Sequence, residues 1–271
     1  MTWDDAPEPE MPRPGLLAPL IAVVRIVLIV LVTIVLTIPY LLLKGFGVGA
    51  RERLVGIWAR AVLTCLGVRL TTVGTPRAAG AVVANHVSWM DILTMRAAAP
   101  VTFVSKAEVR GWPAIGMLAA MVGTMFIERK ATEAKRQQIE MKRRVDDGAL
   151  LCFFPEGTST DGRRVLPFKS SLFAVFMSED LRETVEVQPV TLAYLPRQGL
   201  PEAFFGWWGD MGLLSSMWHV LTLAAGSRVE VRFAEPIPAR EVDHRKTLAQ
   251  RSFVAVAGGL VDAGIRVPEA G

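Results

Sequence analysis

A long uncharged apolar run near the N-terminus constrains this chain more than any other feature. Residues 26–43 read IVLIVLVTIVLTIPYLLL, and the apolar character extends upstream to Leu16 with Arg25 as the interruption. A helix that crosses a bilayer needs about 20 mostly apolar residues. The run therefore predicts a membrane-anchoring helical segment. The residues before it are acidic rather than basic, and no clear cleavage site follows it, which disfavours a signal peptide.

The flanks of this run suggest how it is oriented. Four basic residues follow it: Lys44, Arg51, Arg53 and Arg60. By the positive-inside rule, this flank lies on the cytoplasmic side. A spanning helix is the favoured interpretation. Pro39 and Arg25 leave a second one open, in which the segment bends and re-enters the same face as a monotopic anchor.

After the anchor, the sequence predicts an α/β domain. Residues 51–70 have apolar positions at helical spacing and are expected to form an amphipathic helix near the bilayer, an ordinary surface helix being the alternative. Short apolar segments typical of buried strands follow at 81–85, 101–105, 123–128, 150–154, 186–194 and 228–233. Helical stretches are expected at 91–98, 112–121, 132–147 and 168–181. This alternation predicts a mixed, mostly parallel sheet flanked by helices.

The predicted organisation has four parts. An acidic tail covers 1–15, the membrane anchor and amphipathic helix 16–67, the main domain 68–265 and a short tail 266–271. The formal charge of +4 and the pI near 9.3 favour anionic partners, and on charge alone membrane lipid is as good a candidate as nucleic acid. Given the membrane anchor, we expect membrane lipid as the partner and no nucleic acid.

Neither cysteines nor histidines form a metal-ligand pattern. Cys65 and Cys152 both lie inside apolar runs without Cys-x-x-Cys spacing, so neither a disulfide framework nor a zinc site is expected. The three histidines are far apart in the sequence. We therefore expect no metal site.

Polar clusters follow three of the predicted strands. They are NHVSWMD at 85–91, ERK at 128–130 and PEGTSTDGRR at 155–164. In open α/β sheets, ligands bind beyond the carboxyl ends of the strands. We therefore expect these clusters to form one pocket.

His86 and Asp91 are the candidate catalytic pair. A neutral imidazole can take a proton from a hydroxyl group near pH 7. With His86 on the turn and Asp91 in the first helical turn, the carboxylate can reach back to the ring and orient it. The alternative is a buried histidine that is merely satisfied by a nearby acid. The chain has no G-x-S-x-G motif, and Cys152 lies in an apolar strand, so a covalent acyl-enzyme is not indicated.

The motifs resemble a known enzyme family. NHVSWMD, GTMFIER, FPEGTS and VQPV occur in the order, and at roughly the spacing, of the four motif blocks of PlsC-like glycerolipid acyltransferases. The resemblance implies that His86 deprotonates an acceptor hydroxyl and Asp91 orients it. It also implies an acyl thioester of acyl carrier protein or coenzyme A as co-substrate, no further cofactor, and a place at the cytoplasmic face of a bacterial inner membrane.

The same resemblance implies the acceptor-binding residues. Arg129 would contact the polar head of the lysolipid, and the site would be shaped by Glu156, Gly157 and Thr158. Pro189 of VQPV would line or support the pocket wall.

One position departs from the pattern. Phosphate-handling members typically continue FPEGT with Arg, whereas this chain has Ser159. A serine offers one neutral hydroxyl in place of a bidentate guanidinium fork. With Ser159 at this position, the motif resembles that of the branch that acylates lyso-ornithine lipid. Lyso-ornithine lipid is therefore the favoured acceptor. Lysophosphatidate, or use of both acceptors, is the alternative, with Arg163, Arg164 or Lys169 supplying the positive charge.

Other interpretations stay open at this point. The departure at Ser159 also fits a lipid-binding scaffold without turnover, and a His86 that activates water also fits a hydrolase. The aromatic-rich segment 203–223 fits either a membrane-docking surface or a core helix. The basic residues of the predicted helix 132–147 fit either a docking site for acidic acyl carrier protein or a solvated face.

Overall fold

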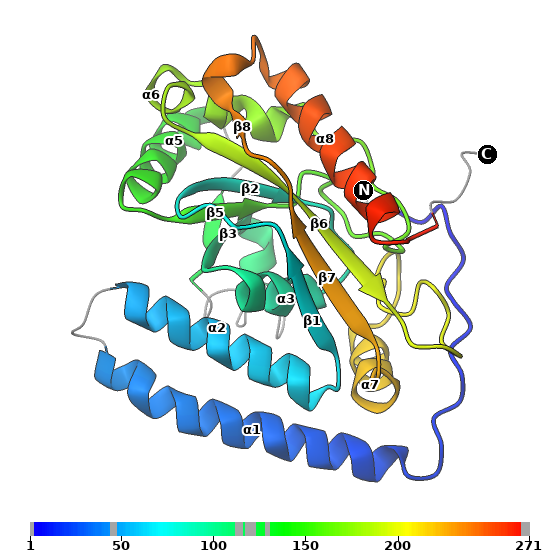
Figure 1. Ribbon diagram of the computed structural model, residues 1–271. Helices are drawn as coiled ribbons and strands as arrows, with labels where there is room; N and C mark the ends of the chain where they lie inside the picture. The colour runs from blue at the N-terminus through cyan, green and yellow to red at the C-terminus, as the bar shows by residue number, and fades with distance from the viewer. Residues whose placement is uncertain (1–2, 44–47, 112–115, 117–122, 128–130, 267–271) are drawn as a thin grey trace.

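A single mixed sheet with helices on both faces forms the body of the molecule (Figure 1). The computed structural model describes residues 3–43, 48–111, 116, 123–127 and 131–266. The predicted helix 112–121 therefore lies almost wholly outside the described residues.

The sheet has eight strands, and most neighbouring pairs are parallel. The order is β1-β7-β6-β2-β5-β3-β4, with β8 paired to β6. Antiparallel pairing is confined to β6 with β7 and β6 with β8. The bounds are β1 Arg69–Val73, β2 Gly80–Ala84, β3 Val101–Lys106, β4 Met125–Ile127, β5 Leu150–Phe153, β6 Glu186–Leu195, β7 Arg228–Phe233 and β8 Ile237–Pro238. This confirms the mixed, mostly parallel sheet that the sequence predicts.

Helices cover the two faces of the sheet and create two apolar cores. On one face lie α2 (Val48–Cys65), α3 (Met90–Ala98) and α7 (Leu213–Leu223). The other face carries α5 (Ala131–Asp146), α6 (Glu179–Arg182), α8 (Arg245–Asp262) and the 3₁₀ helix η3 (Ser170–Met177). Two short 3₁₀ helices, η2 (Ala107–Gly111) and η4 (Ala239–Glu241), complete the described elements. Side chains of β2 alternate between the two cores, Val82 facing one and Val83 the other.

The long apolar run forms α1 (Ala18–Leu42), which lies along the outside of the molecule below α2 (Figure 1). Among the described residues, α1 is the one helix whose length and composition would allow it to cross a membrane. It packs on α2 and α7, but most of its leucine, isoleucine and valine side chains are exposed. An exposed apolar surface of this extent marks a membrane or protein contact. The helix thus fits the predicted membrane anchor.

Two predicted helices differ from the structure. Residues 168–181 form η3 and the short α6 instead of one α-helix. Phe173 and Phe176 are both buried, and a 3₁₀ helix puts residues three apart on one face. The amphipathic helix ends at Cys65, because Gly67 adopts a φ of 75° and turns the chain into β1.

Candidate active site

His86 lies on the turn that joins β2 to α3, and Asp91 lies in the first turn of α3. The His86 Nδ1 atom is 2.6 Å from the Asp91 Oδ2 atom. An ionised carboxylate can only accept hydrogen bonds, so Nδ1 carries the proton and Nε2 is left as the basic nitrogen. The His86 side chain is 26% exposed, whereas the Asp91 side chain is completely buried. The contact that the sequence predicts between this pair is therefore present.

Hydrogen bonds compensate for the burial of the Asp91 carboxylate. Its Oδ2 atom also accepts from the backbone N–H groups of Val87 and Ser88, at 2.7 and 3.0 Å. Its Oδ1 atom accepts from the Tyr194 hydroxyl at 2.8 Å. Four donors satisfy the oxygens of this buried carboxylate and hold it in one orientation. It can therefore fix the imidazole and stabilise an imidazolium.

The chain after β5 supports His86 from the other side. The Phe154 ring stacks on the imidazole with centroids 4.4 Å apart. The Glu156 carboxylate accepts from the backbone N–H of His86 at 2.8 Å and of Leu166 at 3.0 Å. Burial raises the pKa of Glu156 to about 8, against the lowering effect of these two donors. Glu156 thus ties the His86 turn to the loop that follows the FPEGT motif.

Asn85 and Tyr194 belong to the same support and were not predicted as site residues. The Asn85 side-chain amide donates to the Leu192 carbonyl at 3.0 Å and accepts from the Leu192 N–H at 2.8 Å. It therefore extends the β2–β6 pairing by one residue beyond Ala84. The hydroxyl of Tyr194, near the end of β6, lies 3.0 Å from the Thr94 hydroxyl and also donates to Asp91 Oδ1. The strand sequence gives no sign that this tyrosine reaches the Asp91 carboxylate.

The three residues after Glu156 have different surroundings. Gly157 has a φ of 73°, and a β-carbon there would lie 2.5 Å from the Lys169 amine, so a side chain would collide with Lys169. The Thr158 hydroxyl accepts from the backbone N–H of Trp3 at 3.2 Å. The Ser159 hydroxyl is nearly buried and donates to the Trp207 carbonyl. Ser159 therefore holds two loops together instead of facing an open site.

The predicted positive charges differ in how far they are already neutralised. Arg164 pairs with Asp161 at 3.0 Å, and Arg163 pairs with Glu202 at 2.7 Å. Lys169 is exposed, and no described carboxylate lies within ion-pair distance of it. Lys169 is thus the member of the three whose charge is most open to a ligand. Arg129 lies outside the described residues.

Pro189 lies within β6 in register with Val83, three residues before His86. It is buried, and its carbonyl accepts from Ala234 N–H at 3.0 Å. It supports the sheet close to the site. The described residues contain no cluster of three metal-ligating side chains, and Cys152 is a buried free thiol.

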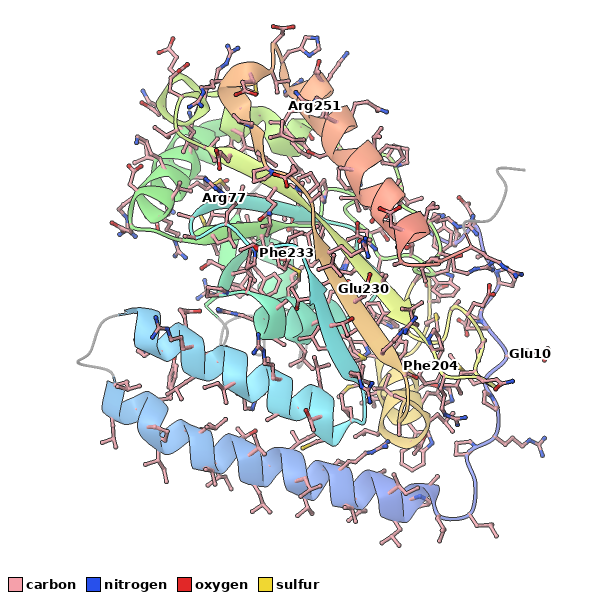
Figure 2. All side chains as sticks on the ribbon, viewed as in Figure 1. Glu10, Arg77, Phe204, Glu230, Phe233 and Arg251 are labelled. Atoms are coloured by element: carbon pink, nitrogen blue, oxygen red, sulfur yellow. The ribbon has the colours of Figure 1, made fainter. Side chains whose placement is uncertain are left out.

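The aromatic segment 203–223 divides into two parts. Phe204, Phe205 and Trp208 are buried in the body of the molecule, whereas Leu214 and Trp218 on α7 are exposed. Figure 2 shows Phe204 close to α7, in the part of the molecule that α1 crosses. The first part of the segment thus fits the core alternative, and for the exposed part the membrane-docking surface stays a prediction.

The fold and the His86–Asp91 pair beyond parallel strands are those of an α/β enzyme, with a long exposed apolar helix along its side. Comparisons with known proteins identify the family. The family model "Acyltransferase" matches residues 72–193. A lyso-ornithine lipid O-acyltransferase of Rhodobacter capsulatus is 45% identical over 74% of this chain and 73% of its own length. The chain therefore belongs to the acyltransferase family and is an enzyme.

Two further similarities agree with this. A 1-acyl-sn-glycerol-3-phosphate acyltransferase of Neisseria meningitidis is 31% identical, over 79% of this chain and 83% of that protein. The crystal structure of the acyltransferase PlsC from Thermotoga maritima superimposes with a TM-score of 0.65 at 20% identity. It covers 94% of this chain and 97% of that one, so the two proteins share their fold.

Proposed function

We propose that this enzyme transfers a fatty acyl chain from an acyl thioester to the free hydroxyl of lyso-ornithine lipid, giving ornithine lipid. The observation that carries the proposal is the His86 ring, whose Nδ1 atom is held 2.6 Å from buried Asp91 while the ring stays partly exposed. A base in this state accepts the proton of a lipid hydroxyl. The similarity to the lyso-ornithine enzyme of R. capsulatus supports the choice of acceptor.

The chemistry needs no covalent enzyme intermediate. The acceptor O–H gives its proton to His86 Nε2 while its oxygen attacks the thioester carbonyl carbon. The C–S bond then breaks, and the imidazolium returns the proton to the departing thiolate. Asp91 stabilises the imidazolium throughout, because its buried charge lies against Nδ1.

The charge around the site also favours an amino-acid head group. Arg163 and Arg164 are already paired with carboxylates, and Ser159 replaces the arginine of phosphate-handling members. A head group that carries both an amine and a carboxylate needs fewer fixed positive charges than a phosphomonoester. Lys169, beside Gly157, is the residue we assign to the head-group carboxylate.

Lysophosphatidate is the second candidate acceptor. The similarity to the N. meningitidis 1-acyl-sn-glycerol-3-phosphate acyltransferase favours it, and Lys169 would then hold the phosphate. The donor is an acyl thioester of acyl carrier protein or of coenzyme A. The basic residues of α5 do not decide between them, since Arg143 is paired with Asp147 and Arg144 with Glu140.

We place the protein at the cytoplasmic face of the bacterial inner membrane, where both the thioester and the lysolipid are available. The exposed apolar side chains of α1 and of α7 support this placement. Bilayer contact would cover both surfaces, since α1 packs directly on α7.

Acceptor choice is tested with the purified enzyme in mild detergent. Lyso-ornithine lipid and lysophosphatidate are offered in parallel, with acyl-acyl carrier protein or acyl-coenzyme A as donor. We expect a higher kcat/KM for lyso-ornithine lipid. A kcat/KM that favours lysophosphatidate would transfer the assignment to the second candidate, and thioester loss without diacyl product would indicate a hydrolase.

A further inference from the structure

The N-terminal tail returns to the active-site loops although it precedes the membrane helix. Residues 4–17 are mostly exposed, and Figure 2 shows Glu10 projecting away from the domain. Trp3, directly before them, is buried, with 7% of its surface exposed. Figure 1 shows the tail running from the start of α1 along the side of the molecule to this point. A single buried aromatic at the end of an exposed segment is an anchor.

Trp3 contacts the loop that follows the FPEGT motif. Its backbone N–H donates to the Thr158 hydroxyl at 3.2 Å. The Arg164 guanidinium lies 5.2 Å from the centroid of the Trp3 ring, within the range of a cation–π interaction. The same loop also contacts the His86 turn, because the backbone N–H of Thr160 donates to the His86 carbonyl at 3.0 Å.

Trp3 also contacts the aromatic loop that packs on the same turn. Its ring lies 5.7 Å from that of Trp208, and the Trp208 indole N–H donates to the Ala6 carbonyl at 3.1 Å. The neighbouring Trp207 donates its backbone N–H to the Val87 carbonyl at 3.0 Å. The tail therefore holds together the two loops that enclose the His86 turn.

The connection between Trp3 and α1 is stiff. Four prolines lie between Ala6 and Gly15, at positions 7, 9, 12 and 14. Prolines at this density favour an extended polyproline conformation and reduce the entropy that seating the tail would cost. Met11 packs against the core cluster on the α2 side of the sheet.

We propose that residues 3–15 form a strap that closes the acceptor side of the active site, and that Trp3 is its positioning residue. This inference rests on the proposed acyl transfer to a lysolipid. Trp3 acts through Thr158, Arg164 and Trp208 and holds the loop that follows the FPEGT motif in its acceptor-binding conformation.

The strap and a membrane-crossing α1 exclude each other. A crossing would place Trp3 and His86 on opposite faces of a bilayer about 30 Å thick. α1 therefore lies along the membrane surface, with both of its ends on the catalytic side.

A disulfide tests where the strap lies. A β-carbon built on Gly209 would be 3.9 Å from the Asp4 β-carbon, which is within the range that disulfides require. In isolated membranes treated with a mild oxidant such as copper–phenanthroline, which accepts the two electrons of the two thiols, we expect the variant Asp4→Cys/Gly209→Cys to form an intramolecular disulfide. The single variants Asp4→Cys and Gly209→Cys are the controls for the native cysteines. Gly209 has a φ of 58°, at which a side chain is strained, so the unfolding temperature is measured on Gly209→Cys and on the double variant. Absence of the bond in the folded double variant would overturn the strap. This readout needs no activity, so it stays informative if the proposed function fails.

Kinetics test the positioning role. We expect Trp3→Ala to raise the acceptor KM by about tenfold, because binding must then order the loop. The donor KM and the unfolding temperature should change little, and Trp3→Phe should restore most of the loss. Glu8→Ala, in the exposed part of the tail, is the matched control. An acceptor KM in Trp3→Ala equal to that of Glu8→Ala would overturn the role. If Trp3→Ala does not fold, the acceptor KM of Trp3→Phe and of the cross-linked variant is measured in its place. A strap that the disulfide holds in place should keep the wild-type acceptor KM.

Discussion

Replacing Asp91 with asparagine removes one charge from the site and leaves the hydrogen-bond geometry in place. Asparagine has the shape of aspartate, and its oxygen can occupy the Oδ2 position. There it would still accept from His86 Nδ1 and the two backbone N–H groups. The amide NH₂ would then face Tyr194, whose hydroxyl can accept a hydrogen bond as well as donate one. The Asp91→Asn variant therefore isolates the electrostatic contribution of Asp91.

The size of this contribution follows from the geometry. With Nδ1 and Oδ2 2.6 Å apart, the charge centres of the imidazolium and the carboxylate lie about 4 Å apart. Two unit charges at about 4 Å attract by about 4 kcal/mol at an effective dielectric constant of about 20. Loss of that stabilisation at the transition state corresponds to a decrease in kcat of about three orders of magnitude.

The assay is the initial rate of diacyl lipid formation at saturating donor and acceptor, with the unfolding temperature measured on the same preparations. We expect kcat to fall by about 10³ while KM and the unfolding temperature change much less. If kcat stayed within about tenfold of the wild type, Asp91 would be only a structural partner of a buried histidine, and the general-base reasoning would be wrong.

Three further predictions follow from the support of the site. Tyr194→Phe removes the donor to Asp91 Oδ1 and frees the carboxylate to turn away from His86, so kcat should fall by about tenfold while the acceptor KM changes little; an unchanged kcat with normal folding would contradict this. Burial raises the pKa of Glu156 from its ordinary 4.5 to about 8, so the stability that the folded state gains by holding this proton is complete below pH 4.5 and is lost as the pH rises through 8. The stability advantage of wild type over Glu156→Gln should thus be larger at pH 5.5 than at pH 8.5 in urea titrations, and an equal difference would refute the shift. Lys169→Gln should raise the acceptor KM by roughly tenfold without changing the donor KM, and an unchanged acceptor KM would remove Lys169 from the head-group site.

The sequence was most informative where function depends on local geometry. A strand, a turn and the first turn of a helix are adjacent in the chain, so the contact between His86 and Asp91 could be predicted from their spacing. The strands at 186–194 and 228–233 were predicted almost to the residue, because their β-branched residues fill the buried centre of the sheet.

Contacts between distant segments could not be predicted in this way. Tyr194 is 103 residues from Asp91, and Trp3 is 155 residues from Thr158. In the sequence, Tyr194 is one more apolar residue of a strand and Trp3 one aromatic residue in an acidic tail. The short edge strand β1 was also missed, since its residues are largely exposed and give a weak apolar pattern.

Product analysis of wild type and His86→Ala with lyso-ornithine lipid and acyl-acyl carrier protein tests the central claim most directly. Mass spectrometry quantifies the ornithine lipid formed, and the unfolding temperature confirms that the variant is folded. We expect product from the wild type and only background product from His86→Ala at an unchanged unfolding temperature. Product from the folded variant at a rate near that of the wild type would contradict it.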